Sequence, residues 1–237
     1  MPRKTVRFFY DCLSPFSYLA FQTFRRYQNV WDIELELKPI LLGIVMASTG
    51  NVPPGARPWA KATRLVSEQD MERNKIWFNV PNMKGTPSNF FGPKGPTDKS
   101  GLARDFRYMR MLSAVDLISP KNLADATECT FKMIHCDDRD NNNNVIVSEM
   151  RLQQICVKSG MSPKVAREIV DSINTDDVKE NLKNNIADAI KNGAYGSPFF
   201  MCEDQVYFGS DRLEQFAFVH GFPWYGPDPS RPSVAKL

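Results

Sequence analysis

Apolar side chains near the start of the chain follow first a strand pattern, then a helix pattern, then a strand pattern again. Residues 5–11 are mostly aromatic or β-branched, as in a short buried strand. Apolar residues then recur at three- and four-residue spacing from Phe16 to Tyr27, and residues 33–39 alternate apolar and polar side chains. The pattern therefore predicts a strand, a helix and a second strand, with the strands paired in parallel through a right-handed crossover.

The middle of the chain, from Leu41 to about Lys191, has the pattern of helices joined by polar loops. Ser119-Pro120 and Ser162-Pro163 each place a serine that can cap a helix before a proline that suits its first turn. Residues 79–99 form a long loop rich in proline, glycine and asparagine. Residues 137–144 are acidic but lack the glycine and final glutamate of a calcium loop, so we interpret them as a solvated linker.

Strand character returns near the end of the chain. Residues 198–202 and 205–208 are apolar and aromatic and flank a Glu203-Asp204 turn, which predicts a β-hairpin. Gly209-Ser210-Asp211 then opens a predicted helix that ends at Gly221. The element order is therefore β-α-β, a run of helices, and β-β-α.

This order is that of a thioredoxin-like α/β domain interrupted by a helical insertion. We expect residues 1–44 and 190–225 to form the thioredoxin-like domain and residues 45–189 to form the inserted all-helical domain. The prolines of residues 226–237 favour a C-terminal tail that wraps the surface.

Composition excludes several classes of partner. The chain has 237 residues, of which 42% are hydrophobic and 24% charged, as in an ordinary globular protein. A net charge of +3 without a run of basic residues gives no reason to expect a nucleic-acid partner. We expect no membrane insertion, because no apolar run approaches the length of a transmembrane helix and no signal-peptide pattern precedes the first strand.

The five cysteines are odd in number and include no C-x-x-C pair, which favours free thiols in a reducing compartment. We expect Cys129, Cys136, Cys156 and Cys202 to pack as small hydrophobic residues. The only histidines are His135 and His220, and neither has a cysteine pair at ligand spacing beside it. The sequence therefore gives no reason to expect a metal.

The turn at residues 11–18 is the first candidate for chemistry. Ser14 is placed to cap the first helix, and Pro15 is placed at its first position, where a missing N–H costs nothing. A helix N-terminus carries a partial positive charge that attracts anions. Taken alone, the stretch is most simply an ordinary capped helix.

A resemblance to a known family gives this turn a specific interpretation. It rests on Phe9-Tyr10-Asp11 with Leu13-Ser14-Pro15-Phe16-Ser17-Tyr18, on Gly50-Asn51-x-Pro53-Pro54-Gly55, on Gly196-Ser197-Pro198 and on Gly209-Ser210-Asp211-Arg212. These stretches resemble those of kappa-class glutathione transferases, and the likeness runs nearly end to end. It extends to the related 2-hydroxychromene-2-carboxylate isomerases. The resemblance implies a DsbA-like thioredoxin fold, glutathione as co-substrate and a homodimer.

The resemblance also implies roles for individual residues. Ser14 and Ser17 stand where redox-active relatives carry the cysteines of C-x-x-C, so the protein cannot form that disulfide. Ser14 would instead stabilise the thiolate of glutathione, and Ser17 would be structural. The implied glutathione-binding residues are Ser14, Pro15, Phe16, Asn51, Lys61, Ser197, Pro198, Ser210 and Asp211.

In this scheme a cis bond before Pro198 leaves the backbone of Ser197 free to pair with the glutathione peptide. Ser210 and its neighbouring N–H groups suit the γ-glutamyl carboxylate, and Asp211 suits the ammonium. Asn51 and Lys61 would close over the ligand from the insertion, although the spacing to Lys61 is one residue longer than in the family.

The chain departs from the family pattern mainly on the side that would receive the second substrate. Phe16, Tyr18 and Ser197 differ from the usual residues, and the loop at residues 79–99 is longer. Trp59, Trp77, Phe90 and Phe91 are candidates for an apolar acceptor pocket, with a place in the core as the alternative.

These features predict a glutathione transferase that conjugates apolar electrophiles such as aryl halides or reduces hydroperoxides. A glutathione-dependent isomerase and a non-catalytic glutathione- or peptide-binding protein remain alternatives. A disulfide oxidoreductase is disfavoured, because Cys12 finds Pro15 rather than a cysteine at C-x-x-C spacing. The C-terminal Ala235-Lys236-Leu237 resembles a peroxisomal address, with the mitochondrion or the cytosol as alternatives.

Overall fold

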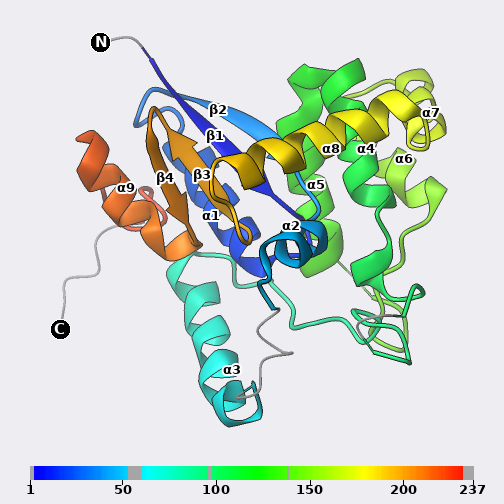
Figure 1. The fold of residues 1–237 in the computed structure, drawn as a ribbon, viewed down its shortest axis with the longest axis horizontal. Helices are drawn as coiled ribbons and strands as arrows, with labels where there is room; N and C mark the ends of the chain where they lie inside the picture. Colours follow the sequence, from blue (N-terminus) through cyan, green and yellow to red (C-terminus); the bar gives the residue numbers. More distant parts are fainter. Residues whose placement is uncertain (1–2, 53–59, 96–97, 138, 232–237) are drawn as a thin grey trace.

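The computed structural model describes residues 3–52, 60–95, 98–137 and 139–231, without the side chains of residues 60–66. Its centre is a sheet with the strand order β2-β1-β3-β4 (Figure 1). The strands are β1 (Lys4–Tyr10), β2 (Ile33–Pro39), β3 (Phe199–Cys202) and β4 (Gln205–Phe208).

The strand pairing confirms the predicted topology. β1 pairs in parallel with β2, from Lys4 opposite Ile33 to Tyr10 opposite Pro39. β3 pairs antiparallel with both β1 and β4, and the hairpin turns at Glu203-Asp204 as predicted. The end of β1 and the start of β3 therefore lie side by side at one end of the two central strands.

Helices cover both faces of the sheet. Helix α1 (Pro15–Tyr27) and helix α9 (Leu213–His220) cover the face that carries Phe8, and Phe24 of α1 contacts the rings of Phe8, at 5.5 Å between centroids, and Phe200, at 5.1 Å. Helix α8 (Asp176–Lys191) crosses the other face (Figure 1), where its Asp188 pairs with Arg7 of β1. The predicted thioredoxin-like core is thus a sheet between two helical layers.

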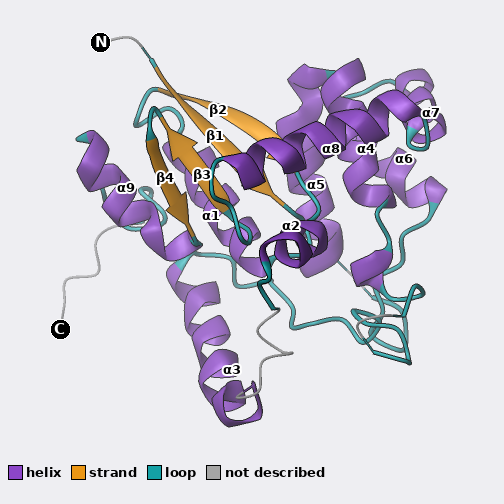
Figure 2. Ribbon diagram, in the orientation of Figure 1, coloured by secondary structure: helices purple, strands orange, loops and turns teal. Residues whose placement is uncertain are grey.

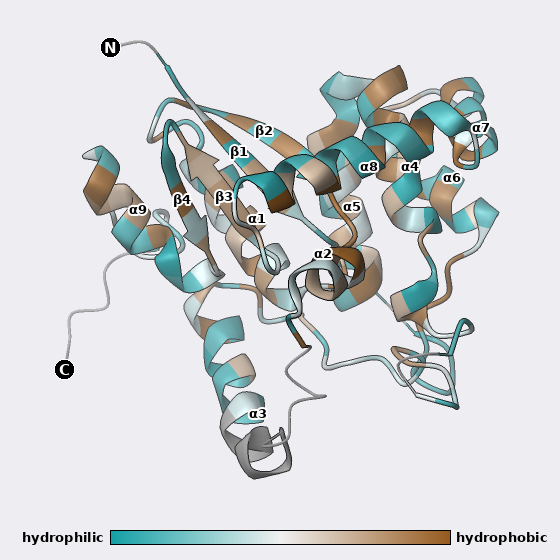
Figure 3. Cartoon of the chain, in the orientation of Figure 1, coloured by the Kyte–Doolittle hydropathy of each residue, from teal (hydrophilic) through white to brown (hydrophobic). Residues whose placement is uncertain are grey.

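The chain between β2 and β3 is helical over most of its length (Figure 2). The remaining helices are α2 (Leu42–Thr49), α3 (Ala60–Trp77), α4 (Arg107–Ile118), α5 (Leu123–His135), α6 (Glu149–Lys158) and α7 (Pro163–Ser172), with short 3₁₀ turns at Leu102–Arg104 and Pro120–Asn122. The described part of α3 is mostly hydrophilic and extends away from the sheet (Figure 3). The limits of the two domains stay a prediction.

The two Ser-Pro helix starts behave differently. Ser162 caps α7 as predicted, because its hydroxyl accepts the Val165 N–H at 3.3 Å. Ser119 does not cap a helix, since its hydroxyl lies 2.7 Å from the side-chain oxygen of Asn122 and a 3₁₀ turn precedes α5. The start predicted at Ser119-Pro120 is therefore wrong by one turn.

The C-terminal segment returns across α1, as the prolines predicted. The Trp31 indole donates to the Pro223 carbonyl and the Tyr27 hydroxyl to the Gly226 carbonyl, each at 2.7 Å. Asp228 then accepts the side-chain N–H of Asn79 at 2.6 Å. Among the described helices, none is long and apolar enough to cross a lipid bilayer.

Candidate functional site

Ser14 caps α1 as the sequence predicted. Its backbone is extended (φ −76°, ψ 115°), and its hydroxyl accepts the Ser17 N–H at 3.2 Å. Pro15 follows as the first helical residue. The N-terminus of α1 therefore lies directly after the turn that ends β1.

The first turn of α1 leaves one backbone donor open. The Ser17 N–H is bonded to Ser14 Oγ, the Tyr18 N–H donates to the Ser14 carbonyl at 3.2 Å, and Pro15 has no N–H. Phe16 is different, because its N–H has no partner among the described residues and its side chain is exposed. Together with the Ser14 hydroxyl, this N–H gives the positive end of the helix a pair of donors for an anion.

Ser197 lies against this turn and holds it from the side of β3. The Ser197-Pro198 peptide bond is cis, as the family resemblance implied. The Ser14 hydroxyl donates to the Ser197 carbonyl at 3.1 Å, and the Asp11 N–H donates to Ser197 Oγ at 3.1 Å. The hydroxyls of Ser17 and Ser197 are 2.6 Å apart. Ser17 thus has the structural role that the resemblance implied.

One detail of the predicted Ser197 backbone is corrected. Both its N–H and its carbonyl were expected to be free for the glutathione peptide. The carbonyl instead accepts the Ser14 hydroxyl, because the cap of α1 and the loop before β3 meet at hydrogen-bond distance. Among the residues that the structure describes, the Ser197 N–H has no partner and stays available.

Asp11 was not singled out in the sequence, yet it organises the turn. Its buried carboxylate accepts the Leu13 N–H at 2.9 Å and the Leu42 N–H at 2.8 Å, which joins the turn after β1 to the start of α2. Burial raises the pKa of Asp11 to about 6, against the lowering effect of these two hydrogen bonds. The sequence signal was an acidic residue directly after a buried strand.

His135 supports the same turn from α5. Its Nε2 lies 2.8 Å from the Cys12 carbonyl, so Nε2 carries the proton, because a carbonyl oxygen can only accept. The ring stacks on Tyr18, with 5.7 Å between centroids. Burial lowers the pKa of His135 to about 4, so the ring is neutral near pH 7.

The thiol of Cys12 is unsuited to chemistry. Burial raises its pKa well above the ordinary value, and the negative charge of Asp11 adds to the effect. A thiol that stays protonated is a poor nucleophile, so Cys12 is a poor candidate for a reacting sulfur at this turn.

A second helix start lies beside the first. Gly209 adopts φ 100°, and its N–H donates to the Pro198 carbonyl at 3.0 Å. The 3₁₀ turn Ser210–Arg212 follows, packs against α1 and leads into α9. Ser210 is buried, whereas Asp211 is exposed and pairs with Arg212 at 3.1 Å. The predicted γ-glutamyl residues therefore stand next to Pro198.

Asn51 reaches the same loop from the other side. Its side-chain N–H donates to the Tyr195 carbonyl at 2.7 Å, and its Oδ1 accepts the Val52 N–H at 2.8 Å. Gly196 fits closely here, because a Cβ would lie 2.7 Å from the ring of Phe208. The side chain of Lys61 and the whole of Trp59 lie outside the described residues, so these two candidates remain predictions.

The predicted acceptor aromatics do not line one pocket among the described residues. Trp77 is 60% exposed on α3, and Phe90 and Phe91 contact each other with 4.8 Å between centroids. Two exposed rings belong to the converging segments: Phe16, on the first turn of α1, and Tyr195, which packs in a tilted arrangement against Phe208 with 4.3 Å between ring centroids. The sequence comparison with the family placed the change at Phe16 on the acceptor side, whereas Tyr195 was not singled out from the sequence.

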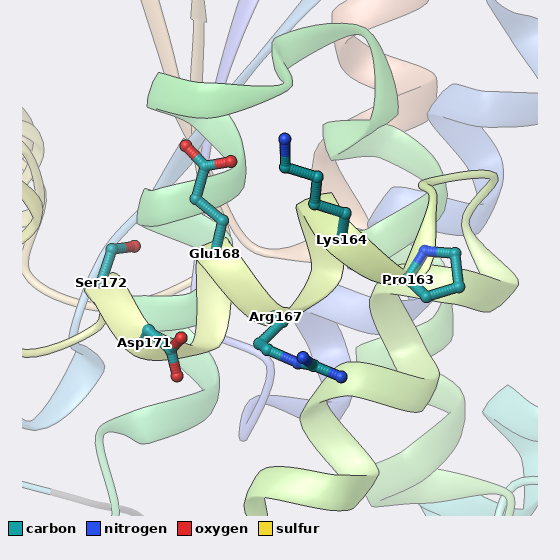
Figure 4. Close-up of a pocket in the computed structure, with 6 residues that line it drawn as sticks. All are labelled: Pro163, Lys164, Arg167, Glu168, Asp171 and Ser172. Carbon is teal, nitrogen blue, oxygen red and sulfur yellow. The ribbon is translucent and has the colours of Figure 1, made fainter.

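Two hollows on the surface of the described residues differ in their relation to these segments. The larger, of about 700 Å³, is lined by residues of α7 alone, whose side chains spread along one helix without an opposing wall (Figure 4). The other, of about 430 Å³, lies between β4 and α9, and its lining includes Tyr195, Phe208 and Arg212. Of these two hollows, the second adjoins the loop before β3 through Tyr195 and the turn after β4 through Phe208 and Arg212.

The fold and this site define the class of protein. Residues 5–90 and 141–218 match the family described as the DSBA-like thioredoxin domain. The chain is 32% identical to glutathione S-transferase kappa 1 of Homo sapiens and 33% identical to that of Rattus norvegicus, in each case over 95% of both chains. The protein therefore belongs to the kappa-class glutathione transferase family.

The comparison with solved structures agrees at the level of the fold. The structure of a 2-hydroxychromene-2-carboxylate isomerase aligns with a TM-score of 0.69 at 21% identity and covers 92% of this chain and 94% of that one. At this identity the likeness establishes a shared architecture. It gives no reason to prefer an isomerase over a transferase.

Proposed function

We propose that the protein is a glutathione transferase that stabilises the thiolate of glutathione at Ser14 for attack on apolar electrophiles. The observation that carries the proposal is that three chain segments meet at one end of the sheet. They are the start of α1, the loop before β3 and the turn after β4. Ser14 donates to the Ser197 carbonyl, and the Pro198 carbonyl accepts from Gly209, next to Ser210. The relatives named glutathione S-transferase kappa 1 support the choice of ligand.

The chemistry requires a lowered thiol pKa. A cysteine thiol has a pKa of about 8.5, so only a few per cent is thiolate at neutral pH. Lowering that pKa by about two units takes ~2.7 kcal/mol and makes the thiolate the major form. The Ser14 hydroxyl, the open Phe16 N–H and the positive end of α1 are the groups that supply this energy.

The Ser14 hydroxyl has to change its acceptor when glutathione binds. In the structure it donates to the Ser197 carbonyl at 3.1 Å. A thiolate at the end of α1 is a stronger acceptor than a neutral carbonyl, so the single hydroxyl proton turns to the sulfur. The Ser14 Oγ lone pair that accepts the Ser17 N–H keeps the hydroxyl oxygen in place during this change.

The remainder of glutathione has matching partners. The free Ser197 N–H suits a carbonyl of the glutathione peptide, as in the addition of a strand to a sheet edge. Ser210 and the start of its turn suit the γ-glutamyl carboxylate, and Asp211 suits the ammonium once it leaves Arg212. Asn51 fixes the loop before Ser197, and Lys61 is proposed for the glycyl carboxylate.

Two reactions follow from a bound thiolate. In conjugation the sulfur forms a bond to an electrophilic carbon, and the leaving group departs with its electron pair. In hydroperoxide reduction the thiolate attacks one peroxide oxygen, the O–O bond breaks and the alcohol leaves. A second glutathione then reacts with the sulfenic acid of the first to give the disulfide and water. The exposed rings of Phe16 and Tyr195 are the proposed contacts for an apolar acceptor.

Conjugation kinetics test the proposal. Wild-type protein is mixed with glutathione and an activated aryl halide, and both the conjugate and the remaining glutathione are measured. A transferase forms the conjugate and consumes glutathione, and the reaction should slow about tenfold or more in Ser14→Ala. Binding of glutathione without turnover would mean that the protein is a binding protein and not a transferase. Unchanged turnover in Ser14→Ala would overturn the proposed role of Ser14.

We also propose a homodimer and a peroxisomal location, both implied by family resemblance and sequence. An exposed apolar surface supports the dimer: Phe218 is 85% exposed on α9, and Val206 and Val219 line the hollow between β4 and α9. Light scattering should give the mass of a dimer for wild type and of a monomer for Phe218→Glu. A reporter fused to the last three residues, against one without them, tests the address.

A further inference from the structure

A second group of chemically active side chains lies at the other end of the sheet. Ser14 follows the end of β1, whereas Cys202 at the end of β3 pairs with Val6 near the start of β1. The turn residue Glu203 follows Cys202, and His220 is the last residue of α9. Cys202, Glu203 and His220 therefore form a cluster that is separate from the proposed glutathione site.

The three side chains come close enough to share one ion. The Cys202 Sγ, a carboxylate oxygen of Glu203 and a ring nitrogen of His220 all lie within 4.8 Å of one another. Cys202 is buried, and the side chain of His220 is 3% exposed. Glu203 is exposed and closes the group from the solvent side.

The fold directs these side chains to one point. Cys202 lies two residues after Phe200, so both side chains leave β3 on the face covered by α9, where Phe200 contacts Phe216 at 5.7 Å between centroids. His220 lies one turn after Phe216 on the same helix. The β3–β4 hairpin and the end of α9 thus meet at this cluster.

Hydrogen bonds orient the histidine and the carboxylate. The Tyr207 hydroxyl lies 3.3 Å from His220 Nε2, and His220 Nδ1 lies 3.7 Å from Glu203 Oε2. With the Nε2–H donated to Tyr207, the Nδ1 lone pair faces the cluster, which is how metal-binding histidines are usually held. The Lys4 ammonium pairs with Glu203 Oε1 at 2.8 Å, whereas Glu203 Oε2 faces His220.

We propose that Cys202, Glu203 and His220 bind a thiophilic divalent cation of the Zn²⁺ type, with water as the fourth ligand. Thiolate, imidazole and carboxylate are the donors that Zn²⁺ takes in tetrahedral protein sites, whereas Mg²⁺ and Ca²⁺ prefer oxygen alone. On binding, the Cys202 thiol loses its proton to solvent and the sulfur forms the bond to the metal. The bound ion joins the hairpin to the end of α9.

Sequence patterns alone do not reveal this proposed site. The spacing rule looks for cysteine and histidine pairs within one short segment. Here the ligands come from a strand, the following turn and the end of a helix, and only the fold brings His220 to Cys202 and Glu203.

Titration with Co²⁺ tests the site directly, because a Co²⁺–thiolate bond gives a charge-transfer absorption that protein without such a bond lacks. The full-length protein is reduced with a phosphine and titrated, and Zn²⁺ is added to displace Co²⁺. Wild type should show the band, and Cys202→Ser should lose it. His220→Gln and Glu203→Gln should bind at least about tenfold more weakly, since each loses a ligand.

The matched control is Cys129→Ser, which removes a partly buried thiol on α5 and should keep the band. Circular dichroism without metal checks that each variant folds. Glu203→Gln is the variant least expected to disturb folding, because Glu203 lies in an exposed turn. Absence of the band in folded wild type, or its persistence in Cys202→Ser, would overturn the site. Neither readout involves glutathione, so this result is independent of the proposed transferase activity.

Discussion

Ser14 does two things with one hydroxyl, because it caps α1 and donates to the Ser197 carbonyl. Ser14→Ala should therefore lower the free energy of unfolding by about 1 kcal/mol through the lost cap, in addition to its effect on the bound thiol. Chemical denaturation without glutathione measures the first effect alone.

Ser162 provides the control for this substitution. It also precedes a proline and caps a helix, and it lies at the start of α7, outside the converging segments of the proposed site. Ser162→Ala should cost a similar amount of stability and leave conjugation unchanged. Equal losses of conjugation in both variants would mean that Ser14 acts only through the stability of its helix.

The residues that sequence patterns identified are those with a local signature. A serine before a proline at a helix start marks Ser14, and the cis Ser197-Pro198 bond was implied by the family resemblance. His135 carries no such signature, because its partner Cys12 is distant in sequence. Asp11 is marked only by its place after a strand, since its second partner Leu42 is also distant in sequence. Their importance comes from burial, which only the packed structure reveals.

His135 should give the protein a distinctive acid sensitivity. Its pKa falls from the ordinary 6.5 to about 4, so its contribution to stability is complete above pH 6.5 and is lost as the pH falls toward 4. The loss amounts to roughly 3 kcal/mol. His135→Gln keeps a donor for the Cys12 carbonyl and cannot titrate.

The difference in unfolding free energy between wild type and His135→Gln, measured from pH 7 to pH 4, should therefore shift in favour of the variant as the pH falls. Asp11 titrates with the opposite sign, because its pKa is raised from 3.8 to about 6 and its contribution is lost as the pH rises through that range. Since Asp11 is present in both proteins, it cancels in the difference. A difference that does not change with pH would contradict a buried neutral His135.

At the scale of the elements, periodicity predicted the sheet and the hairpin closely. β2 spans Ile33–Pro39 and β4 spans Gln205–Phe208, the limits that alternation and the Glu203-Asp204 turn gave. The start of α5 was misplaced, because Ser119 uses its hydroxyl on Asn122 instead of a helix N–H. A capping residue identifies a possible helix start, and the bonds that it makes depend on the folded loop.

Gly196 tests how closely the loop before β3 must fit. A Cβ at this position would lie 2.7 Å from the Phe208 ring, so Gly196→Ala should displace that ring or the Ser197 loop. We expect a loss of about 1–3 kcal/mol in stability and weaker glutathione binding, measured by denaturation and calorimetry.

Gly43→Ala in α2 is the matched control. Its added Cβ meets no atom within 4 Å, and a helix favours alanine, so this variant should be as stable as wild type or more stable. If Gly196→Ala were as stable as wild type and bound glutathione equally well, the close fit of Gly196 against Phe208 would matter for neither stability nor binding.

At the scale of the whole molecule, the C-terminal segment fastens separate parts of the chain. Asp228 accepts the Asn79 side chain at 2.6 Å, next to Arg26 of α1, and is itself buried. Asp228→Ala should cost about 1 kcal/mol, because the partly buried side-chain N–H of Asn79 loses its buried acceptor. Limited proteolysis should then cut the segment after α9 faster than in wild type, whereas equal rates would contradict its role as a fastening.

The sheet also separates two proposed sites. The thiolate site lies where β1 ends and β3 begins, and the Cys202 cluster lies at the opposite end of the same strands. The first follows from motifs along the sequence, whereas the second arises only from the packing of α9 against the hairpin. A short signature therefore reveals one kind of site and misses the other.

The N-terminus of α1 is proposed to turn the glutathione thiol into a thiolate. The most direct test is the ultraviolet absorbance of the thiolate of bound glutathione, followed against pH in wild type and Ser14→Ala. For wild type we predict an apparent pKa about two units below the ~8.5 of a free thiol, with a rise toward that value in Ser14→Ala. A wild-type pKa close to that of the free thiol would mean that the protein does not stabilise the thiolate of bound glutathione.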